Sequence, residues 1–322
     1  MRRENGLISI TKGACRRALV RLVGRERLPR LALEAAGARK VASEALRGLA
    51  LERFYDEEVG RPYGVDRKAK EELVERFQRN TQGIESGTTW MVHVVLAQEI
   101  LSVPAGTCGV VIECGCWKGA STASLSLVCG LVGRRLIVCD SFEGLPEDDG
   151  EAAHDYPHIR AFGYYRKGMY SARLEEVREN VARFGDPSIC EFLPGFFSES
   201  LKALTEPIVM AFLDVDLASS TRDCVKYVWP LLVDGGAVYT DDSCDMNVVR
   251  IWFDDPWWQE ALGRQAPGYV GSGCGLALSP DFSSVGYARK VASPQESYGR
   301  VPWLHYPDGS AGPAGSSSEN SP

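Results

Sequence analysis

The sequence predicts an α/β protein in which helices cover both faces of a seven-stranded, mostly parallel sheet. Short apolar runs recur at residues 108–112, 135–139, 190–193, 208–213 and 236–239. Helix-like stretches separate the first two runs and the last two. Such alternation is typical of βαβ units, which place the carboxyl ends of all parallel strands along one edge of the sheet. A glycine turn or acidic residues follow four of the five runs, so we expect a ligand site at that edge.

The first predicted strand, 108–112, leads into a glycine turn at 113–119 and then into an apolar helix at 120–132. Strand, turn and helix N-terminus form a ligand cradle, because the free backbone N–H groups point toward the ligand. The turn departs from the dinucleotide fingerprint, since Trp117 stands where the second glycine would be. Glu113, two residues before the first glycine, is instead typical of the turn that holds the methionine end of S-adenosylmethionine.

The second and third predicted strands suggest where a nucleoside would bind. Asp140 ends the run 135–139, and an acid at this strand tip hydrogen-bonds a ribose in doubly wound folds, including those that bind NAD. The third run, 190–193, leads to a loop with Phe196 and Phe197, where an aromatic ring could stack on adenine. The alternative for either phenylalanine is a place in the hydrophobic core.

Acidic pairs follow the fourth and fifth predicted strands. Asp214 and Asp216 end the run 208–213, and Asp241 and Asp242 end the run 236–239, with a helix-like stretch at 219–232 between them. A parallel crossover brings these strand ends together, and carboxylate oxygens in that number suit Mg²⁺. The alternative is that each pair only caps a loop or helix. The combination at βαβ spacing favours a metal site at Asp214, Asp241 and Asp242.

The remaining segments complete the expected architecture. We predict helices at 66–79, 88–103 and 248–262, and a closing hairpin from the runs 273–278 and 283–290. The segment 146–168 holds His154, His158 and three tyrosines with few helix signals, so it is interpreted as a lid over the acceptor.

Five strings, in the order IECGCWKGAS, VCDSFEGLPEDD, LEEVRENVARFG, FLDVDLASSTRD and GGAVYTDD, resemble the macrocin O-methyltransferase family. The resemblance covers roughly residues 86–278. It implies a Rossmann-like class I methyltransferase fold with an N-terminal helical extension, and a metal-dependent enzyme that methylates sugars of antibiotics. Val215 and Ala218 stand where the family usually has glycine and tyrosine, and Ala120 where it has glycine, so the acceptor is less well defined than the chemistry.

The resemblance assigns roles to individual residues. Asp214, Asp241 and Asp242 would bind Mg²⁺. The loop 79–90 resembles the segment that closes over the cofactor and contributes Thr88. With the strand-end arguments above, the expected S-adenosylmethionine site comprises Glu113, Gly115, Gly119, Asp140, Ser141, Phe142, Gly195, Phe196, Phe197, Ser198 and Thr88.

The expected reaction moves the methyl group of S-adenosylmethionine to a hydroxyl of a sugar or another vicinal diol, in natural-product tailoring. A metal would orient the hydroxyl and lower its pKa, and a general base would accept its proton. Candidates for the base are Asp214, Asp216 and His158, or else His154. One alternative is a nicotinamide-dependent oxidoreductase, against which Trp117 and the lack of a Tyr-x-x-x-Lys motif argue. Another is a non-catalytic protein that binds S-adenosylmethionine.

Composition and charge limit the possible locations and partners of the protein. With 322 residues, 44% of them hydrophobic, the chain can bury one large core. No apolar run reaches membrane-spanning length, and the sequence shows no charged, apolar, cleavable secretory start, so we expect a cytoplasmic protein. The ten cysteines lack C-x-x-C spacing and are interpreted as mostly buried thiols. Nucleic acid is an unexpected partner because the chain beyond residue 40 carries 25 Lys or Arg against 40 Asp or Glu and shows no interleaving of aromatic and basic residues.

The expected domain organisation has three parts. Residues 1–85 form a basic, helical extension with the cofactor-covering loop, and residues 1–40 alone carry 11 Lys or Arg against 3 Asp or Glu. An amphipathic helix at 14–36 would pack on the body or on a second subunit, which leaves a homo-oligomer open. Residues 86–300 form the methyltransferase domain, and 301–322 a disordered tail rich in Gly, Ser and Pro.

Overall fold

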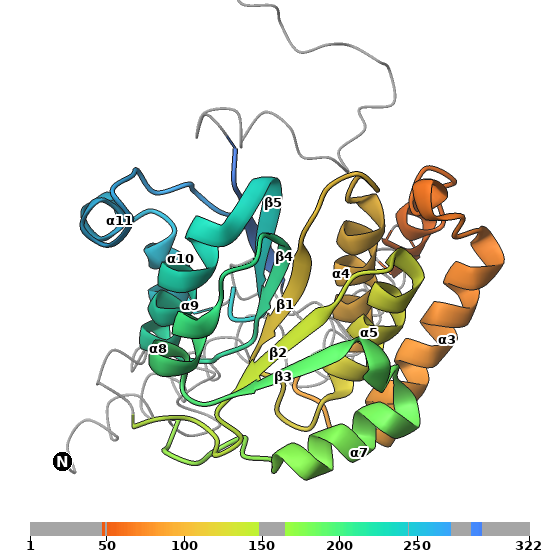
Figure 1. The fold of residues 1–322 in the computed structure, drawn as a ribbon, viewed down its shortest axis with the longest axis horizontal. Helices are drawn as coiled ribbons and strands as arrows, with labels where there is room; N and C mark the ends of the chain where they lie inside the picture. Colours follow the sequence, from red (N-terminus) through yellow and green to blue (C-terminus); the bar gives the residue numbers. More distant parts are fainter. Residues whose placement is uncertain (1–46, 49, 148–164, 244, 272–284, 292–322) are drawn as a thin grey trace, which may run out of the picture.

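Seven strands form one sheet in the computed structural model, which describes residues 47–48, 50–147, 165–243, 245–271 and 285–291. The strand order is β3-β2-β1-β4-β5-β7-β6 (Figure 1). Neighbours among β1 to β5 pair in parallel, and β7 runs antiparallel to both β5 and β6. The predicted α/β class with a mostly parallel sheet is therefore confirmed.

The strands fall close to the predicted apolar runs. Their bounds are β1 Val110–Cys114, β2 Leu136–Asp140, β3 Cys190–Pro194, β4 Ile208–Leu213, β5 Leu232–Thr240, β6 Val270–Gly271 and β7 Gly286–Arg289. The run 273–278, predicted as the first strand of the closing hairpin, lies outside the described residues. The partner of β7 is instead the short β6, which comes just before that run.

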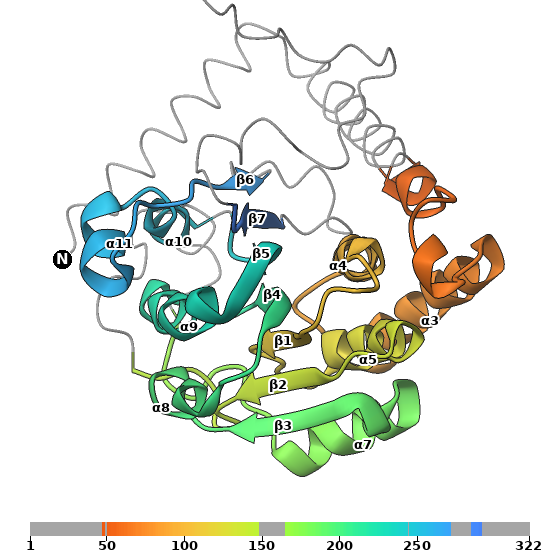
Figure 2. The same cartoon turned by 45° about the horizontal axis from the view of Figure 1, so that its top comes forward.

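Helices cover both faces of the sheet (Figure 2). One face carries α3 Arg67–Gly83, α4 Trp90–Ser102, α5 Ala120–Val132 and α7 Leu174–Phe184. The other carries α8 Phe197–Ser200, α9 Ala218–Leu231, α10 Met246–Ile251 and α11 Asp255–Leu262. Short 3₁₀ turns occur at η1 Arg61–Tyr63, η2 Pro187–Ile189 and η3 Leu201–Ala203.

Side chains of the central strands alternate between two hydrophobic cores. Val111 and Phe212 belong to the core under α4, α5 and α7, whereas Ile112 and Ala211 belong to the core under α9. This alternation follows from the two-residue period of a strand. Because both faces are covered, buried strands appear in the sequence as continuous apolar runs. Five cysteines are buried free thiols, as the sequence predicted: Cys114, Cys116, Cys129, Cys139 and Cys224.

The helix predicted at 248–262 is wrong as a single element. The structure has two helices, α10 and α11, separated by a turn at 252–254. Asp254 caps α11 by accepting a hydrogen bond from the Trp257 N–H, and Pro256 occupies the first turn. Proline lacks an N–H and disfavours helical backbone before it, so the chain ends one helix and starts another there.

The described part of the N-terminal extension shares the main core. Phe54, Leu73 and Phe77 are buried in the same cluster as residues of α4 and α5. The boundary between residues 85 and 86 stays a prediction. The basic helix at 14–36, the lid residues His154 and His158, and the tail 301–322 lie outside the described residues. Among those described, no helix is long and apolar enough to cross a membrane.

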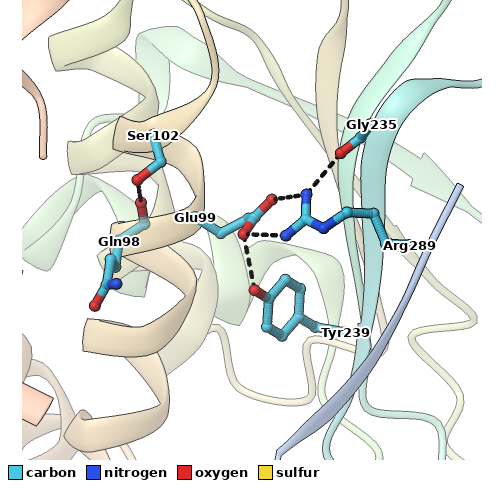
Figure 3. A network of polar contacts seen from close by, with 6 residues as sticks. All are labelled: Gln98, Glu99, Ser102, Gly235, Tyr239 and Arg289. Carbon is cyan, nitrogen blue, oxygen red and sulfur yellow. Dashed lines mark hydrogen bonds and ion pairs between the residues drawn. The ribbon is translucent and has the colours of Figure 1, made fainter. Parts of the chain in front are cut away.

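A buried ion pair joins α4 to the β5–β7 edge of the sheet (Figure 3). Two guanidinium nitrogens of Arg289 donate to the two carboxylate oxygens of Glu99, each over 2.8 Å. The Tyr239 hydroxyl donates to the same carboxylate at 2.9 Å, and Arg289 also donates to the Gly235 carbonyl at 2.6 Å. Both Glu99 oxygens and both Arg289 Nη atoms are paired, whereas the buried Arg289 Nε has no partner. The network fixes the antiparallel part of the sheet against the helical layer.

Loss of one partner of this pair should be costly. Glu99→Leu strands the buried Arg289 guanidinium, and we expect the free energy of unfolding to fall by about 3–5 kcal/mol. The double variant Glu99→Leu, Arg289→Met should be clearly more stable than the single variant. Urea unfolding checks both, with the exposed acid of the Arg67–Glu71 pair, Glu71→Gln, as the control that leaves stability unchanged. A Glu99→Leu protein as stable as this control would contradict the account.

Candidate active site

The carboxyl ends of neighbouring strands stay hydrogen-bonded one residue beyond the sheet. In each case a backbone N–H of the loop after one strand donates to a carbonyl of the next strand. The bonds are Gly115 to Cys139 (2.9 Å), Asp214 to Cys114 (2.9 Å), Asp241 to Leu213 (3.0 Å) and Gly195 to Asp140 (2.9 Å). The loops after β1, β3, β4 and β5 therefore start from one rigid edge, as the sequence predicted for parallel strand ends.

Glycine is required at position 115 by the neighbouring strand end. Gly115 has φ +82°, and a Cβ placed there would lie 1.9 Å from the Asp214 carbonyl oxygen. Any side chain would push the turn after β1 away from the loop after β4. The turn continues through Trp117, whose φ of +42° is left-handed although it is not glycine. The position of the second glycine in the dinucleotide fingerprint is thus occupied by a residue with left-handed backbone.

The Asp140 carboxylate binds backbone amides of this turn. Its Oδ2 accepts from the N–H groups of Cys116 (2.8 Å) and Trp117 (3.2 Å), and its Oδ1 accepts from Phe142 N–H (2.8 Å). Successive N–H groups in a turn with a left-handed residue form an anion-binding nest. Asp140 therefore orders the turns after β1 and β2, a role that the sequence reasoning missed. Its predicted ribose contact stays a prediction.

The loop after β4 is held in the same way by Asp242. Its Oδ2 accepts from Val215 N–H (3.3 Å) and Asp216 N–H (3.0 Å). Asp216 has φ +61°, so this pair of amides also includes a left-handed residue. Burial raises the pKa of Asp242 to about 6, against the lowering effect of these two hydrogen bonds. One Asp242 oxygen is thus committed to the backbone.

Glu113 lies beneath the turn and does not line the cavity. It is fully buried, and its Oε2 accepts a 2.6 Å hydrogen bond from the Thr122 hydroxyl of α5, whereas Oε1 has no partner. Burial raises its pKa to about 7. The side chain therefore connects β1 to the N-terminal part of α5. Glu113 is not among the residues that line the cavity, and its predicted contact with a cofactor stays a prediction.

A cavity of about 270 Å³ opens at this edge of the sheet. Its lining includes these sequence-predicted residues: Thr88, Gly115, Asp140, Ser141, Phe196, Phe197, Asp214, Asp216, Asp241 and Asp242. Glu113, Gly119, Phe142, Gly195 and Ser198 are not among the lining residues. The structure thus gathers the cofactor-binding and acidic candidates around a single space. His158, the other predicted catalytic residue, lies outside the described part of the chain.

The acidic side chains crowd one another without a basic partner. Burial raises the pKa of Asp214 well above its usual range, and the charges of Asp241 and Asp242 add to this. Burial raises the pKa of Asp216 and Asp241 as well, again with neighbouring carboxylates contributing. No Lys, Arg or His lines the cavity among the described residues. The site therefore has a strong electrostatic preference for a cation.

The carboxylate oxygens of Asp214, Asp241 and Asp242 suit a hard metal ion, but these side chains do not converge on one point in the structure. Asp241 Oδ1 is buried and has no hydrogen-bond partner, which leaves a free ligand atom beside Asp214 and Asp242. Yet no three acidic, histidine or cysteine side chains within the described ranges converge as a metal site. The commitment of Asp242 Oδ2 to the backbone accounts for part of this difference. The residues fit a cation in chemistry and charge.

Thr88 is positioned by a buried histidine. The Thr88 hydroxyl lies 3.0 Å from His93 Nε2 and 3.3 Å from the Ser86 hydroxyl. His93 is fully buried, and desolvation lowers its pKa to about 3, so it is neutral and serves a structural role. The loop that was predicted to cover the cofactor is thereby anchored to α4 at the cavity.

Three aromatic residues of the lining were not predicted as site residues. Tyr165 lies in the described end of the predicted lid 146–168 and Tyr170 just after it, and both line the cavity together with Trp117. Tyr170 makes edge contacts with Trp117 (5.4 Å between ring centroids) and with Tyr165 (6.5 Å). The tyrosine-rich composition of 146–168 was the available signal, but it did not distinguish Tyr165 from its neighbours.

The sheet order and the cavity at the strand ends define a doubly wound α/β protein with a cofactor-type site. Residues 91–261, more than half of the chain, match the family model of the macrocin-O-methyltransferases (TylF). The chain belongs to this family.

Two relatives from Streptomyces align over 143 residues. One is the Streptomyces olivaceus 8-demethyl-8-(2,3-dimethoxy-alpha-L-rhamnosyl)-tetracenomycin-C 4'-O-methyltransferase, which is 36% identical over 42% of this chain and 54% of its own length. The other is the demethyldecarbamoylnovobiocin O-methyltransferase of Streptomyces niveus, at 31% identity over 42% and 52%. The chain thus spans about half the length of the curated relatives it matches.

Solved structures of O-methyltransferases also align with the fold. The O-methyltransferase NovP aligns over 70% of this chain and 81% of its own, at 19% identity and a TM-score of 0.44. The calicheamicin methyltransferase CalS11 aligns over 68% and 92%, at 16% identity and a TM-score of 0.43.

Glu113 should make stability depend on pH. Because its folded-state pKa is raised from 4.5 to about 7, the stability it contributes is complete below pH 4.5 and is lost as the pH rises through 7. Glu113→Gln keeps the acceptor for Thr122 without the charge. We expect its advantage over wild type to grow by on the order of 2 kcal/mol between pH 5 and pH 8.5. Urea unfolding in EDTA measures this, with exposed Glu175→Gln as control. Parallel pH profiles for wild type and Glu113→Gln would refute the assignment.

Asp241 should destabilise the metal-free protein. Because its folded-state pKa is raised well above the ordinary value of 3.8, stability is lost progressively as the pH rises above 3.8 toward the raised pKa, so a cost is already present at neutral pH. Asp241→Asn removes this cost, and we expect a higher melting temperature than wild type in EDTA at pH 8. Asp234→Asn, an exposed position of the same strand, is the matched control. An equal or lower melting temperature for Asp241→Asn would contradict like-charge crowding.

Proposed function

We propose that this protein is a Mg²⁺-dependent O-methyltransferase that moves the methyl group of S-adenosylmethionine to a hydroxyl of a sugar on a glycosylated natural product. One observation supports it most directly. The turn after β1 and the acidic ends of β4 and β5 line the same cavity. A cofactor cradle and a cation-seeking acid cluster are thus adjacent in a member of the macrocin-O-methyltransferase family.

The cofactor end of the cavity would be formed by the first three strand ends. The turn at Gly115 offers a cradle without side-chain obstruction, and Thr88 closes it from the loop before α4. Phe196 is 37% exposed and lines the cavity after β3, where its ring could stack on an adenine. Bound S-adenosylmethionine supplies an electrophilic methyl group and a positive charge that the acidic lining favours.

The metal end would be formed by Asp214, Asp241 and Asp242. These carboxylates repel one another, and a divalent cation relieves that repulsion. Bound Mg²⁺ supplies a Lewis acid that orients a sugar hydroxyl and lowers its pKa. The free Asp241 Oδ1 and the second oxygen of Asp242 are the ligand atoms that the backbone leaves available.

Asp216 is the general base in this proposal. It lines the cavity two residues after Asp214. The hydrogen bond between Asp216 and Asp242 uses the Asp216 N–H and leaves the Asp216 carboxylate out. Asp216 would take the proton of the acceptor hydroxyl as that oxygen receives the methyl group that S-adenosylmethionine would supply. His158 remains the other predicted candidate for this role.

The acceptor class comes from the relatives and from the cavity. The names of both Streptomyces proteins describe O-methyltransferases of antibiotics, and one name specifies a rhamnosyl substituent. The aromatic side chains of Trp117 and Tyr170 at the cavity suit the C–H face of a sugar. We therefore infer a small glycosylated acceptor that presents a hydroxyl beside a second oxygen. Action within the cytoplasm follows from this proposal.

Two variants should distinguish the contribution of metal binding from that of the general base. Asp214→Asn weakens ligation, so excess Mg²⁺ should restore most of its turnover. Asp216→Asn removes the base, so kcat should stay roughly 10²–10⁴-fold below wild type even at saturating Mg²⁺. The assay follows label from methyl-labelled S-adenosylmethionine into 4-nitrophenyl α-L-rhamnoside, other aryl glycosides and catechol. Wild-type transfer should stop in EDTA and return with Mg²⁺.

The controls keep the parts of the proposal distinct. Asp234→Asn should match wild type in every condition. Full transfer after thorough chelation would refute the metal requirement, and transfer to catechol but to no glycoside would refute the sugar acceptor. Stabilisation by NAD instead of S-adenosylmethionine in a melting experiment would favour the oxidoreductase alternative. Cofactor binding without any methyl transfer would favour a binding protein.

A further inference from the structure

An ion pair joins two loops that line the cofactor end of the cavity. Lys118 Nζ lies 2.6 Å from Glu85 Oε2 and 5.2 Å from the centre of the Trp117 ring. Glu85 lies in the loop before α4, whereas Trp117 and Lys118 lie in the turn after β1. Glu85 and Trp117 line the cavity, but Lys118 is not among the lining residues. The pair therefore connects the two loops from outside the space that a ligand would fill.

The loop that carries Glu85 is anchored on both sides of this residue. On one side, Ile84 is buried against α5. On the other, the Thr88 hydroxyl lies 3.0 Å from His93 Nε2 of α4. Between these anchors Gly87 is exposed, and a Cβ placed there would meet nothing within 4 Å. The ion pair thus ties the loosely packed middle of the loop to the turn after β1.

The lysine side of the pair is the more rigid one. The Lys118 carbonyl accepts a 2.9 Å hydrogen bond from Asn180 Nδ2 of α7, and the Lys118 side chain is only 28% exposed. The Glu85 side chain is 65% exposed. Ion pairs exposed to water contribute little free energy and weaken further in salt, so this pair can break and form again readily.

We propose that Glu85 and Lys118 form a latch, which must break to let S-adenosylmethionine enter the cavity or its product leave. The inference rests on the proposed function only in placing that cofactor between the loop before α4 and the turn after β1. Because the pair joins two protein groups and Lys118 lies outside the lining, it stays formed with the cofactor bound or absent. The pair is broken only during passage. Both residues position the loop and contribute no cofactor contact.

A latch of this kind affects the rates of binding and not the affinity. Since the pair is present before and after binding but absent during passage, its loss lowers the barrier equally in both directions. Lys118→Met removes the charge with a side chain of similar length, and Glu85→Gln keeps the shape without the charge. Each variant should raise the association and dissociation rates of S-adenosylhomocysteine by about two- to fivefold, with Kd within about twofold of wild type.

Stopped-flow tryptophan fluorescence measures both rates, and calorimetry measures Kd, for the full chain with S-adenosylhomocysteine. The matched control is Lys202→Met, which removes the lysine of the exposed Lys202–Glu199 pair (2.7 Å), because neither of these residues lines the cavity. Its rates should equal those of wild type. In about 1 M NaCl the latch is screened, so the rates of wild type and Lys118→Met should converge. A difference that persists in this salt would contradict an ionic latch.

A double-mutant cycle tests whether the two residues act through each other. The double variant Glu85→Gln, Lys118→Met should bind and release S-adenosylhomocysteine no faster than either single variant. Rates that rise multiplicatively, or single variants with unchanged rates, would overturn the latch. A Kd raised beyond twofold with a normal association rate would also overturn it, because the altered residue would then be a cofactor contact. Melting temperatures of the single variants should equal that of Lys202→Met, and a marked drop would indicate a structural role instead.

The proposed function and the latch can fail separately. If wild type binds S-adenosylhomocysteine but methylates no glycoside, the proposed reaction fails, and the binding rates still decide the latch. If wild type methylates a glycoside and neither variant alters the binding rates, only the latch fails. Absence of S-adenosylhomocysteine binding to wild type would overturn both.

Discussion

The site depends on two carboxylates that each follow one strand and bind backbone amides of the turn after the neighbouring strand. Asp140, at the end of β2, binds two amides after β1, and Asp242, just after β5, binds two amides after β4. Each turn contains a left-handed non-glycine residue, Trp117 in one and Asp216 in the other. Such backbone is costly for most side chains, and the charge-assisted hydrogen bonds offset that cost. The two turns are therefore ordered by the same kind of carboxylate–amide hydrogen bonding.

The acidic residues of the site therefore have different roles. Asp140 and one oxygen of Asp242 are used for structure, and Asp214, Asp216 and Asp241 remain to face the cavity. The cavity-facing acids have raised pKa values because they are desolvated and close to one another. That electrostatic cost is unnecessary for the fold. In the proposed function, a cation and a positively charged cofactor would offset this cost.

Some features follow from sequence patterns because they depend on local periodicity. The buried run of β4 was predicted with its bounds, and Asp214 and Asp241 emerged at one edge because parallel pairing leaves no other arrangement. Other features depend on contacts that periodicity does not encode. The break at Pro256 was visible in the sequence but was overridden by the apolar pattern around it. The backbone roles of Asp140 and Asp242 require the three-dimensional positions of the turns after neighbouring strands.

The central claim is that the acids at the ends of β4 and β5 bind a divalent cation beside the cofactor cradle. Anomalous diffraction from crystals soaked in Mn²⁺, which takes the same oxygen ligands as Mg²⁺, tests it most directly. The account predicts a single strong peak in the cavity among Asp214, Asp241 and Asp242, absent in crystals of Asp241→Asn. Crystals with no peak at these side chains, at Mn²⁺ concentrations that support methyl transfer, would contradict it.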